Sequence, residues 1–188
     1  MRKIIIFASG GGSNAEQIVI QSLKNKRFSV EAIFSNQPKA GVLEKAEKYQ
    51  IPTVVFSKSS FESEAFLKQI ESFQPDLIVL AGFLWKIPSY LVRAFDNKII
   101  NIHPALLPKY GGKGMYGMHV HKAVFENKEP ESGITIHFVN EHYDEGDFIF
   151  QEKVAITDCE TPEAIATKVL QLEHQFFPLV IEKMLLKT

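Results

Sequence analysis

The chain has 188 residues, 45% of them hydrophobic and 23% charged, which is the composition of an ordinary globular protein that can bury one substantial core. Its formal net charge is -1, without a basic tract or an acidic tail, which argues against nucleic acid as the main partner. The single cysteine, Cys159, excludes an internal disulfide and fits a reducing compartment, so we expect a cytoplasmic protein. The length predicts one domain over residues 1–188.

The chain begins with an apolar run that we predict to be a strand. Residues 4–8 are too few for the core of a signal peptide, give way to glycines and lack a small-residue cleavage site. Later segments also fall short of the apolar length that crosses a bilayer. We therefore expect no membrane partner.

Up to residue 103, short apolar runs alternate with amphipathic segments. We predict strands at residues 4–8, 28–34, 52–56, 77–80 and 98–102, and helices at residues 15–25, 40–49, 61–73 and 88–95. Because this alternation is typical of parallel strands joined by right-handed helical crossovers, we predict a Rossmann-like α/β fold. Its sheet should be mostly parallel and carry helices on both faces.

Beyond residue 103 the pattern changes. Residues 104–118 hold four glycines without periodicity, which predicts a mobile loop over the carboxyl edge of the sheet. We then predict a helix at residues 119–126, two strands at 134–139 and 148–156, and a last helix from 161 to 186. The two strands should form an antiparallel extension of the sheet, and the last helix should break or kink at Pro178.

The most informative stretch is Asn101-Ile102-His103-Pro104, at the end of a buried apolar strand. Pro104 ends the strand, so an amide and an imidazole come at its carboxyl end, where open α/β sheets bind ligands. Residues two apart in a strand point to the same side. Asn101 and His103 are therefore candidates for acyl transfer, as an oxyanion donor and a proton-transfer group. The alternative is that both are structural polar residues.

The first strand runs into Gly10-Gly11-Gly12-Ser13-Asn14, just before a helix. Small residues there allow backbone N–H groups to approach an anion, so we predict a phosphate site. The dinucleotide pattern G-x-G-x-x-A also fits, but the second strand ends in Phe34-Ser35-Asn36, without the acidic residue that would bind a ribose hydroxyl. We prefer a single phosphate to a dinucleotide, and a tight turn without a ligand is the alternative.

Asp144 lies in an acidic stretch between the last two predicted strands. A carboxylate close to His103 would favour the imidazolium and help to order a water for proton transfer. The alternative is a solvated acidic turn.

The histidines do not form a recognisable metal motif. His119 and His121 are two residues apart and so face apart in a helix, and the sequence holds neither H-E-x-x-H nor C-x-x-C. We expect no metal. We expect His137, which lies between Ile136 and Phe138 in a strand, to be a partly buried structural histidine.

Five segments, in this order, closely resemble the phosphoribosylglycinamide formyltransferase family of purine synthesis: residues 9–14, 80–83, 101–110, 133–139 and 143–146. The resemblance covers essentially the whole chain, and its most specific part is Asn-Ile-His-Pro followed by Leu-Leu-Pro. It implies the formyltransferase fold. It also implies transfer of the formyl group of 10-formyltetrahydrofolate, a co-substrate, to the amine of 5'-phosphoribosylglycinamide, without a metal or a covalent enzyme intermediate.

The resemblance further implies roles for individual residues. The catalytic residues would be Asn101, protonated His103 and Asp144. The substrate would be held by Gly12, Ser13 and Asn14 at its phosphate and by Glu173 at its amine. The folate site would be lined by Leu84, Trp85, Lys86, Ile87 and Asn101. Small molecules would be the only substrates, and the enzyme would be a monomer or a homodimer.

The sequence departs from the family at the folate site. The family often has arginine where Trp85 stands and a second basic residue near Ser63. Lys86 is the residue that would compensate for them in binding the folate tail. The segment 111–118 is also longer than usual.

Two alternatives belong to other functional classes. A formyltetrahydrofolate hydrolase uses a similar catalytic domain, although we expect it to add a regulatory domain for which this chain has no residues. A nucleotide-binding module would do no chemistry, and Asn101, His103 and Asp144 would then be a coincidence. A transferase acting on methionyl-tRNA would be expected to add a basic C-terminal domain.

Overall fold

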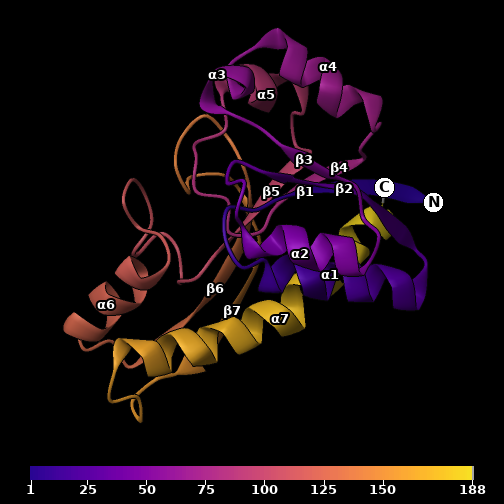
Figure 1. Ribbon diagram of the computed structural model, residues 1–188. Helices are drawn as coiled ribbons and strands as arrows, with labels where there is room; N and C mark the ends of the chain where they lie inside the picture. The colour runs from indigo at the N-terminus through magenta and orange to yellow at the C-terminus, as the bar shows by residue number, and fades with distance from the viewer. Residues whose placement is uncertain (188) are drawn as a thin grey trace.

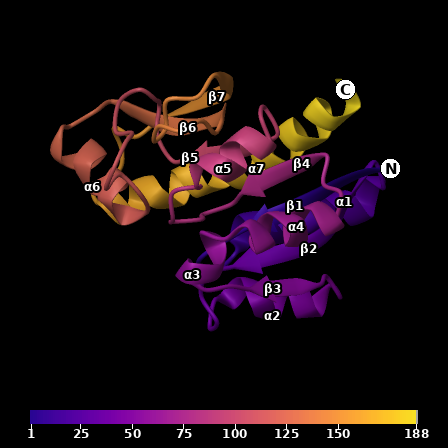
Figure 2. The same cartoon turned by 90° about the horizontal axis from the view of Figure 1, so that it is seen from above.

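The computed structural model describes residues 1–187, which form a seven-stranded sheet between two layers of helices (Figures 1 and 2). The strands are β1 (Arg2–Phe7), β2 (Phe28–Ser35), β3 (Thr53–Val55), β4 (Leu77–Leu80), β5 (Ile99–His103), β6 (Glu131–Phe138) and β7 (Phe148–Ala155). The helices are α1 (Ser13–Asn25), α2 (Gly41–Lys48), α3 (Lys58–Phe61), α4 (Glu64–Ser72), α5 (Ser89–Ala94), α6 (Met118–Glu126) and α7 (Pro162–Lys187).

The strand order in the sheet is β3-β2-β1-β4-β5-β6-β7. The strands from β3 to β5 pair in parallel, whereas β6 pairs antiparallel with β5 and β7 antiparallel with β6. The predicted fold, a mostly parallel sheet with an antiparallel C-terminal extension, is therefore confirmed. Because β1 has β2 on one side and β4 on the other, the crossovers diverge there and leave a crevice at the carboxyl ends of these strands.

Helices cover both faces of the sheet, which explains why its central strands are apolar throughout rather than alternating. Figure 1 shows α1, α2 and α7 below the sheet and α3, α4 and α5 above it. In β1, Ile4 and Ile6 join the core on the side of α1 and α7, while Ile5 and Phe7 join the core on the other side. That second core is rich in phenylalanine, and the ring of Phe7 stacks on that of Phe34 at 4.9 Å between centroids.

The helix predicted at residues 61–73 is wrong in its bounds, because two helices occupy this region. The Ser57 hydroxyl accepts a hydrogen bond from the Ser60 N–H and begins α3. Ser63 stands at the N-cap of α4, and its hydroxyl bonds the Ser60 carbonyl instead of an N–H of α4. A serine at each start therefore favours two short helices over one long one.

Of the break or kink expected at Pro178, the break is wrong, since α7 continues through this residue to Lys187, and the kink stays a prediction. Proline inside a helix removes a hydrogen bond and costs about 3 kcal/mol. Phe177 and Ile181 on either side are fully buried against the sheet. Their burial holds the helix together at a position where local propensity alone would end it.

The C-terminal part of α7 is fixed to α1 by one nearly buried carboxylate. Glu182 is 7% exposed and accepts hydrogen bonds from the side-chain amides of Gln21 at 2.6 Å and Asn25 at 2.9 Å. It also pairs with the guanidinium of Arg27 at 3.0 Å. The Asn25 hydrogen bond, with those of Gln21 and Arg27, outweighs burial and lowers the pKa of Glu182 below its ordinary value of 4.5.

Replacing Glu182 with glutamine should lower the free energy of unfolding by about 1–2 kcal/mol at pH 7, because the charged acceptor of three groups is lost. A carboxyl with a lowered folded pKa stabilises the fold above its ordinary pKa and loses this effect as the pH falls through the folded pKa. The difference between wild type and Glu182→Gln should therefore shrink in acid, as urea unfolding at several pH values would measure. Exposed Lys183→Gln is the control; equal losses in both variants would contradict the role of Glu182.

Candidate active site

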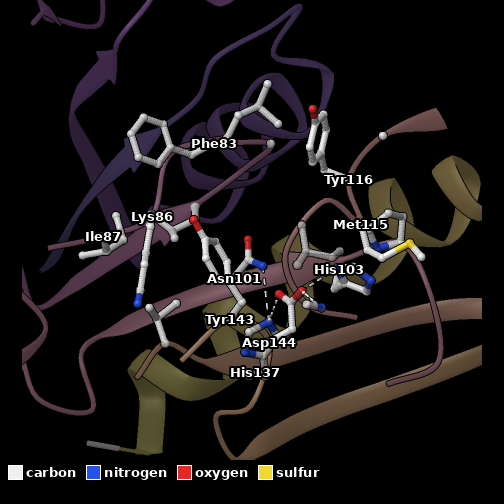
Figure 3. Close-up of a pocket in the computed structure, with 18 of the residues that line it drawn as sticks. Phe83, Lys86, Ile87, Asn101, His103, Met115, Tyr116, His137, Tyr143 and Asp144 are labelled. Carbon is white, nitrogen blue, oxygen red and sulfur yellow. Dashed lines mark hydrogen bonds and ion pairs between the residues drawn. The ribbon is translucent and has the colours of Figure 1, made fainter. Parts of the chain in front are cut away.

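A cavity of about 300 Å³ opens at the carboxyl edge of the sheet, beyond the ends of β4 and β5. Its walls come from residues 82–87 after β4, residues 101–104 of β5 and beyond, most of residues 112–117 before α6 and most of residues 139–144 of the β6–β7 loop. Single residues from other elements complete the lining: Asn14, Leu80, His121, His137 and Glu173. Apolar side chains such as Phe83, Ile87 and Met115 alternate with polar ones around it (Figure 3). The cavity is thus suited to a small molecule with apolar surface that meets a few polar groups.

Asn101 and His103 lie on β5 at the floor of this cavity, on the same side of the strand, as their spacing predicts. His103 is the last residue of β5 and is 3% exposed, and Pro104 ends the strand. The pair therefore stands at the carboxyl end of a central strand. Figure 3 shows both side chains directed toward Asp144.

Asp144 comes from the β6–β7 loop and lies between two histidine rings. Its Oδ2 is 3.6 Å from Nδ1 of His103 and accepts a hydrogen bond from the Gly112 N–H at 2.9 Å. Its Oδ1 is 3.5 Å from Nε2 of His137. Burial raises the pKa of Asp144, but the two rings and the Gly112 N–H outweigh it and hold the pKa below the ordinary value of 3.8. The structure thus joins Asp144 to His103, and the alternative of a solvated turn is wrong.

His103 is fixed in one tautomer by the backbone. Its Nε2 lies 2.7 Å from the carbonyl oxygen of Tyr110, which can only accept, so Nε2 carries the proton. In the neutral ring Nδ1 is then the basic nitrogen, and it faces Asp144. Burial lowers the pKa of His103 below 6.5 despite the opposing effects of Asp144 and the Tyr110 carbonyl. Asp144 therefore favours the imidazolium, as expected, but burial is the larger effect and leaves the pKa of His103 below its ordinary value in the ligand-free protein.

His137, which we expected to be a structural histidine, also belongs to this cluster. Its Nδ1–H donates to the Phe138 carbonyl at 2.8 Å, so Nε2 of the neutral ring can accept a hydrogen bond from Asn101 Nδ2 at 3.3 Å. This contact turns one N–H of the Asn101 amide toward His137 and leaves the other available. Asn101 and His137 are directly opposed in the antiparallel β5–β6 ladder. This register is what brings His137 into the site, and the sequence pattern did not indicate it.

The two histidines of α6 separate as helical spacing predicts. His119 is exposed, whereas His121 is 6% exposed and lines the cavity. Burial, with a smaller contribution from His103, lowers the pKa of His121. Within residues 1–187, the histidine, cysteine and acidic side chains form no group of three or more that could hold a metal ion.

The predicted phosphate loop begins α1, but its residues differ in what they face. The Gly12 carbonyl accepts the Glu16 N–H, so the N–H groups of Ser13, Asn14 and the residue after it have no acceptor within the helix. Of the three predicted residues, only Asn14 is among those that line the cavity. Gly12 has a φ of 71°, and a Cβ there would lie 2.8 Å from Cα of Val42. Gly12 is thus required for packing against α2, and its predicted role at the substrate phosphate stays a prediction.

Glu173 reaches the cavity from α7 and accepts a hydrogen bond from the side-chain amide of Asn14. Burial raises the pKa of Glu173, an effect that the Asn14 hydrogen bond only partly offsets. The predicted substrate residues Asn14 and Glu173 therefore lie together, although the sequence separates them by 159 positions.

Residues 84–87 form one wall of the cavity but are not equivalent. Leu84 is exposed, and its N–H donates to the Ser9 hydroxyl at 3.0 Å. Trp85 packs against the phenylalanine core, at 5.9 Å from Phe61, while Ile87 is buried. Exposed Lys86 lies with its Nζ 5.4 Å from the ring of Tyr143 (Figure 3).

Comparisons with known proteins agree with this architecture. Residues 2–181 match the model of the family described as formyl transferase. The chain is 41% identical to the chloroplastic phosphoribosylglycinamide formyltransferase of Vigna unguiculata over 96% of its own length, and it spans 60% of the length of that plant protein. It is 36% identical to the phosphoribosylglycinamide formyltransferase of Bacillus subtilis, over 98% of this chain and 95% of the other.

A solved structure shows the same likeness in three dimensions. The glycinamide ribonucleotide transformylase 1 of Geobacillus kaustophilus superposes with a TM-score of 0.89 at 33% identity, over 98% of this chain and 99% of that one. The whole arrangement of strands and helices described here is thus shared with that protein.

The glycine at position 12 should be the least replaceable residue of its loop. Gly12→Ala introduces a Cβ against the backbone of Val42 in a left-handed conformation and should lower the free energy of unfolding by about 2 kcal/mol. In Gly10→Ala, the matched control, the new Cβ would meet nothing within 4 Å. Thermal unfolding of both variants measures the difference. Equal stability of the two would contradict the packing role of Gly12.

Proposed function

The chain belongs to the formyl transferase family, and from this we propose that it is a phosphoribosylglycinamide formyltransferase of purine biosynthesis. In the proposed reaction, the amine of 5'-phosphoribosylglycinamide receives the formyl group of 10-formyltetrahydrofolate. The products are formylglycinamide ribonucleotide and tetrahydrofolate.

The observation that carries this proposal is the continuity of one cavity. It is lined at its floor by Asn101, His103 and Asp144, on one side by Asn14 at the start of α1 and Glu173 of α7, and on another by residues 83–87. A transferase must bring two substrates to one point, and such a cavity offers a wall for each of them next to a proton-transfer group.

We assign the stabilisation of the developing oxyanion to Asn101. One N–H of its amide is directed to His137, which fixes the plane of the amide. The second N–H can then donate to the formyl oxygen as negative charge develops on it. A donor held in place before the reaction is more effective than one that must reorient.

We assign proton transfer to His103. Its Nε2–H is used by the Tyr110 carbonyl, so the proton that leaves the attacking amine goes to Nδ1. Asp144, 3.6 Å from this nitrogen, stabilises the imidazolium that forms. Nδ1 then returns the proton to the leaving nitrogen, which restores the neutral ring without a covalent enzyme intermediate.

We assign the phosphate of the glycinamide substrate to the start of α1, where the N–H groups of Ser13 and Asn14 have no helical acceptor and the helix dipole favours an anion. Gly12 supports this turn through its left-handed backbone. Glu173, held by Asn14, would accept hydrogen bonds from the substrate amine.

The wall formed by Leu84, Trp85, Lys86 and Ile87, together with Asn101, is the proposed folate site. Its lining suits a flat ring, with Phe83, Ile87 and Val139 as apolar contacts. 10-Formyltetrahydrofolate supplies the formyl group there. Lys86 at the mouth would attract the carboxylates of the folate tail, in place of the basic residues that this chain lacks at Trp85 and Ser63.

The family acts on small molecules, and among residues 1–187 no helix is long and apolar enough to cross a membrane. The cytoplasmic location and the choice between monomer and homodimer stay predictions. We propose that one chain contains a whole site, because the cavity described above is lined from within it.

The release of tetrahydrofolate from 10-formyltetrahydrofolate, measured with and without phosphoribosylglycinamide, tests the proposed function. Release that depends on the amine substrate is expected. Equal release without it would indicate the hydrolase, and no release in either case would indicate a binding module.

His103→Ala should lower kcat by about 10²–10⁴-fold with little change in substrate KM, as expected for a general acid–base residue.

Asp144→Asn should lower kcat by about tenfold or more and move the acidic limb of the pH–rate profile to lower pH, because the carboxylate raises the pKa of His103 and its removal lowers that pKa further. The double variant should lose less than the product of the single losses. An unshifted limb with multiplicative losses would rule out this coupling.

Lys86→Met should raise the KM for 10-formyltetrahydrofolate by roughly two- to fivefold, the size expected for an exposed ion pair, and leave the KM for the glycinamide substrate unchanged. Lys122→Met, on the exposed face of α6, is the matched control. If both variants bind the folate equally well, the tail does not bind at Lys86.

A further inference from the structure

The turn that follows Pro104 is attached to the sheet by side chains outside the cavity lining. The Thr135 hydroxyl donates to the Ala105 carbonyl at 2.7 Å and accepts the Leu107 N–H at 3.0 Å. The side-chain amide of Gln151, on β7, donates to the Leu107 carbonyl and to the Thr135 hydroxyl, both at 2.9 Å. One amide hydrogen of Gln151 is therefore used by the turn itself and the other by Thr135, the β6 residue that also holds the turn.

This turn leads directly to the carbonyl that fixes His103. Tyr110 comes three residues after Leu107, and its carbonyl oxygen accepts the Nε2–H of His103 at 2.7 Å. The side chain of the same residue is also held, because the Tyr110 hydroxyl donates to the Glu129 carboxylate at 2.9 Å. The carbonyl is thus held between an anchor at Glu129 and the hydrogen bonds that Thr135 and Gln151 make to the turn.

We propose that Gln151 is a positioning residue for the reaction, which holds the 105–110 turn so that the Tyr110 carbonyl keeps the proton of His103 on Nε2. This inference rests on the proposed function, in which Nδ1 of His103 handles the transferred proton. If the carbonyl moves, the ring can rotate or change tautomer, and Nδ1 no longer faces both Asp144 and the substrate. A small displacement of a catalytic group is enough to reduce its rate contribution substantially.

The position of Gln151 makes this role distinguishable from ordinary sheet stability. It is an exposed residue of β7, at the edge of the sheet, and it pairs across the ladder with fully buried Thr135. Lys153, two residues further on the same face, is also exposed and pairs with Glu131 at 3.1 Å. In the part of the chain that the structure describes, Lys153 makes no hydrogen bond or ion pair with the 105–110 turn, so the two residues form a matched pair for substitution.

The charged and titratable groups around His103 stay the same when Gln151 is replaced. Asp144 from the β6–β7 loop and His137 from β6 influence the pKa of the ring, and His103 in turn lowers the pKa of His121 from α6. Among the groups that raise the pKa of His103, the Tyr110 carbonyl is the one that depends on the turn. A weaker hydrogen bond to this carbonyl should therefore lower the pKa of His103 while the other groups keep their effects.

The test compares Gln151→Met, which keeps the side-chain length and removes the donors, with Lys153→Met. We expect Gln151→Met to lower kcat by about tenfold, the value of roughly one or two hydrogen bonds, with both KM values within about twofold of wild type. The acidic limb of its pH–rate profile should move to lower pH. Lys153→Met should behave as wild type, and thermal unfolding should show both variants folded at the assay temperature.

A second readout does not need catalysis. The pKa of His103, followed by ¹⁵N NMR of the ring nitrogens in the full-length protein, should be lower in Gln151→Met than in Lys153→Met. An unchanged His103 pKa, or a kcat equal to that of Lys153→Met, would overturn the inference. If wild type transfers no formyl group but the NMR difference is present, the proposed function fails and the positioning of His103 by Gln151 stands.

Discussion

A carboxylate withdrawn from solvent between two imidazole rings is the constraint on which the rest of the site depends. The side chain of Asp144 is 13% exposed, and burial raises its pKa. The Gly112 N–H donates to the carboxylate, and each of the rings of His103 and His137 lowers the pKa of Asp144 when it is protonated. His103 has the opposite balance, since burial keeps it neutral and Asp144 stabilises a proton only once it arrives. A group that is neutral at rest and stabilised when charged is suited to accept and return a proton.

The fold supplies the parts of this cluster from separate elements. Asn101 and His103 come from β5, the last parallel strand, and the antiparallel β6 places His137 directly opposite Asn101. The loop that joins β6 to β7 then returns Asp144 over the end of β5. The same change of strand direction lets β7 contact the turn after Pro104, so the C-terminal extension of the sheet both contributes to the cluster and supports it.

Much of this could be predicted from the sequence, because periodicity and strand-end chemistry are local. The alternation of apolar runs predicts the parallel strands, and the Asn101–His103 spacing predicts two side chains on one side of a strand end. The role of His137 depends on the register between two strands, and the tautomer of His103 depends on a carbonyl seven residues away. The packing of Gly12 against Val42 and the burial that carries α7 through Pro178 are also tertiary effects, which no local pattern records.

The most direct test of the account is the protonation state of His103 in the ligand-free protein. Ring ¹⁵N NMR, with the His103 signals assigned by their loss in His103→Gln, reports both the charge of the ring and the nitrogen that carries the proton. We expect a neutral ring at pH 7 with the proton on Nε2, and a pKa below 6.5. An imidazolium at pH 7, or a proton on Nδ1, would contradict the proposal that Nδ1 is the nitrogen that receives the proton of the attacking amine.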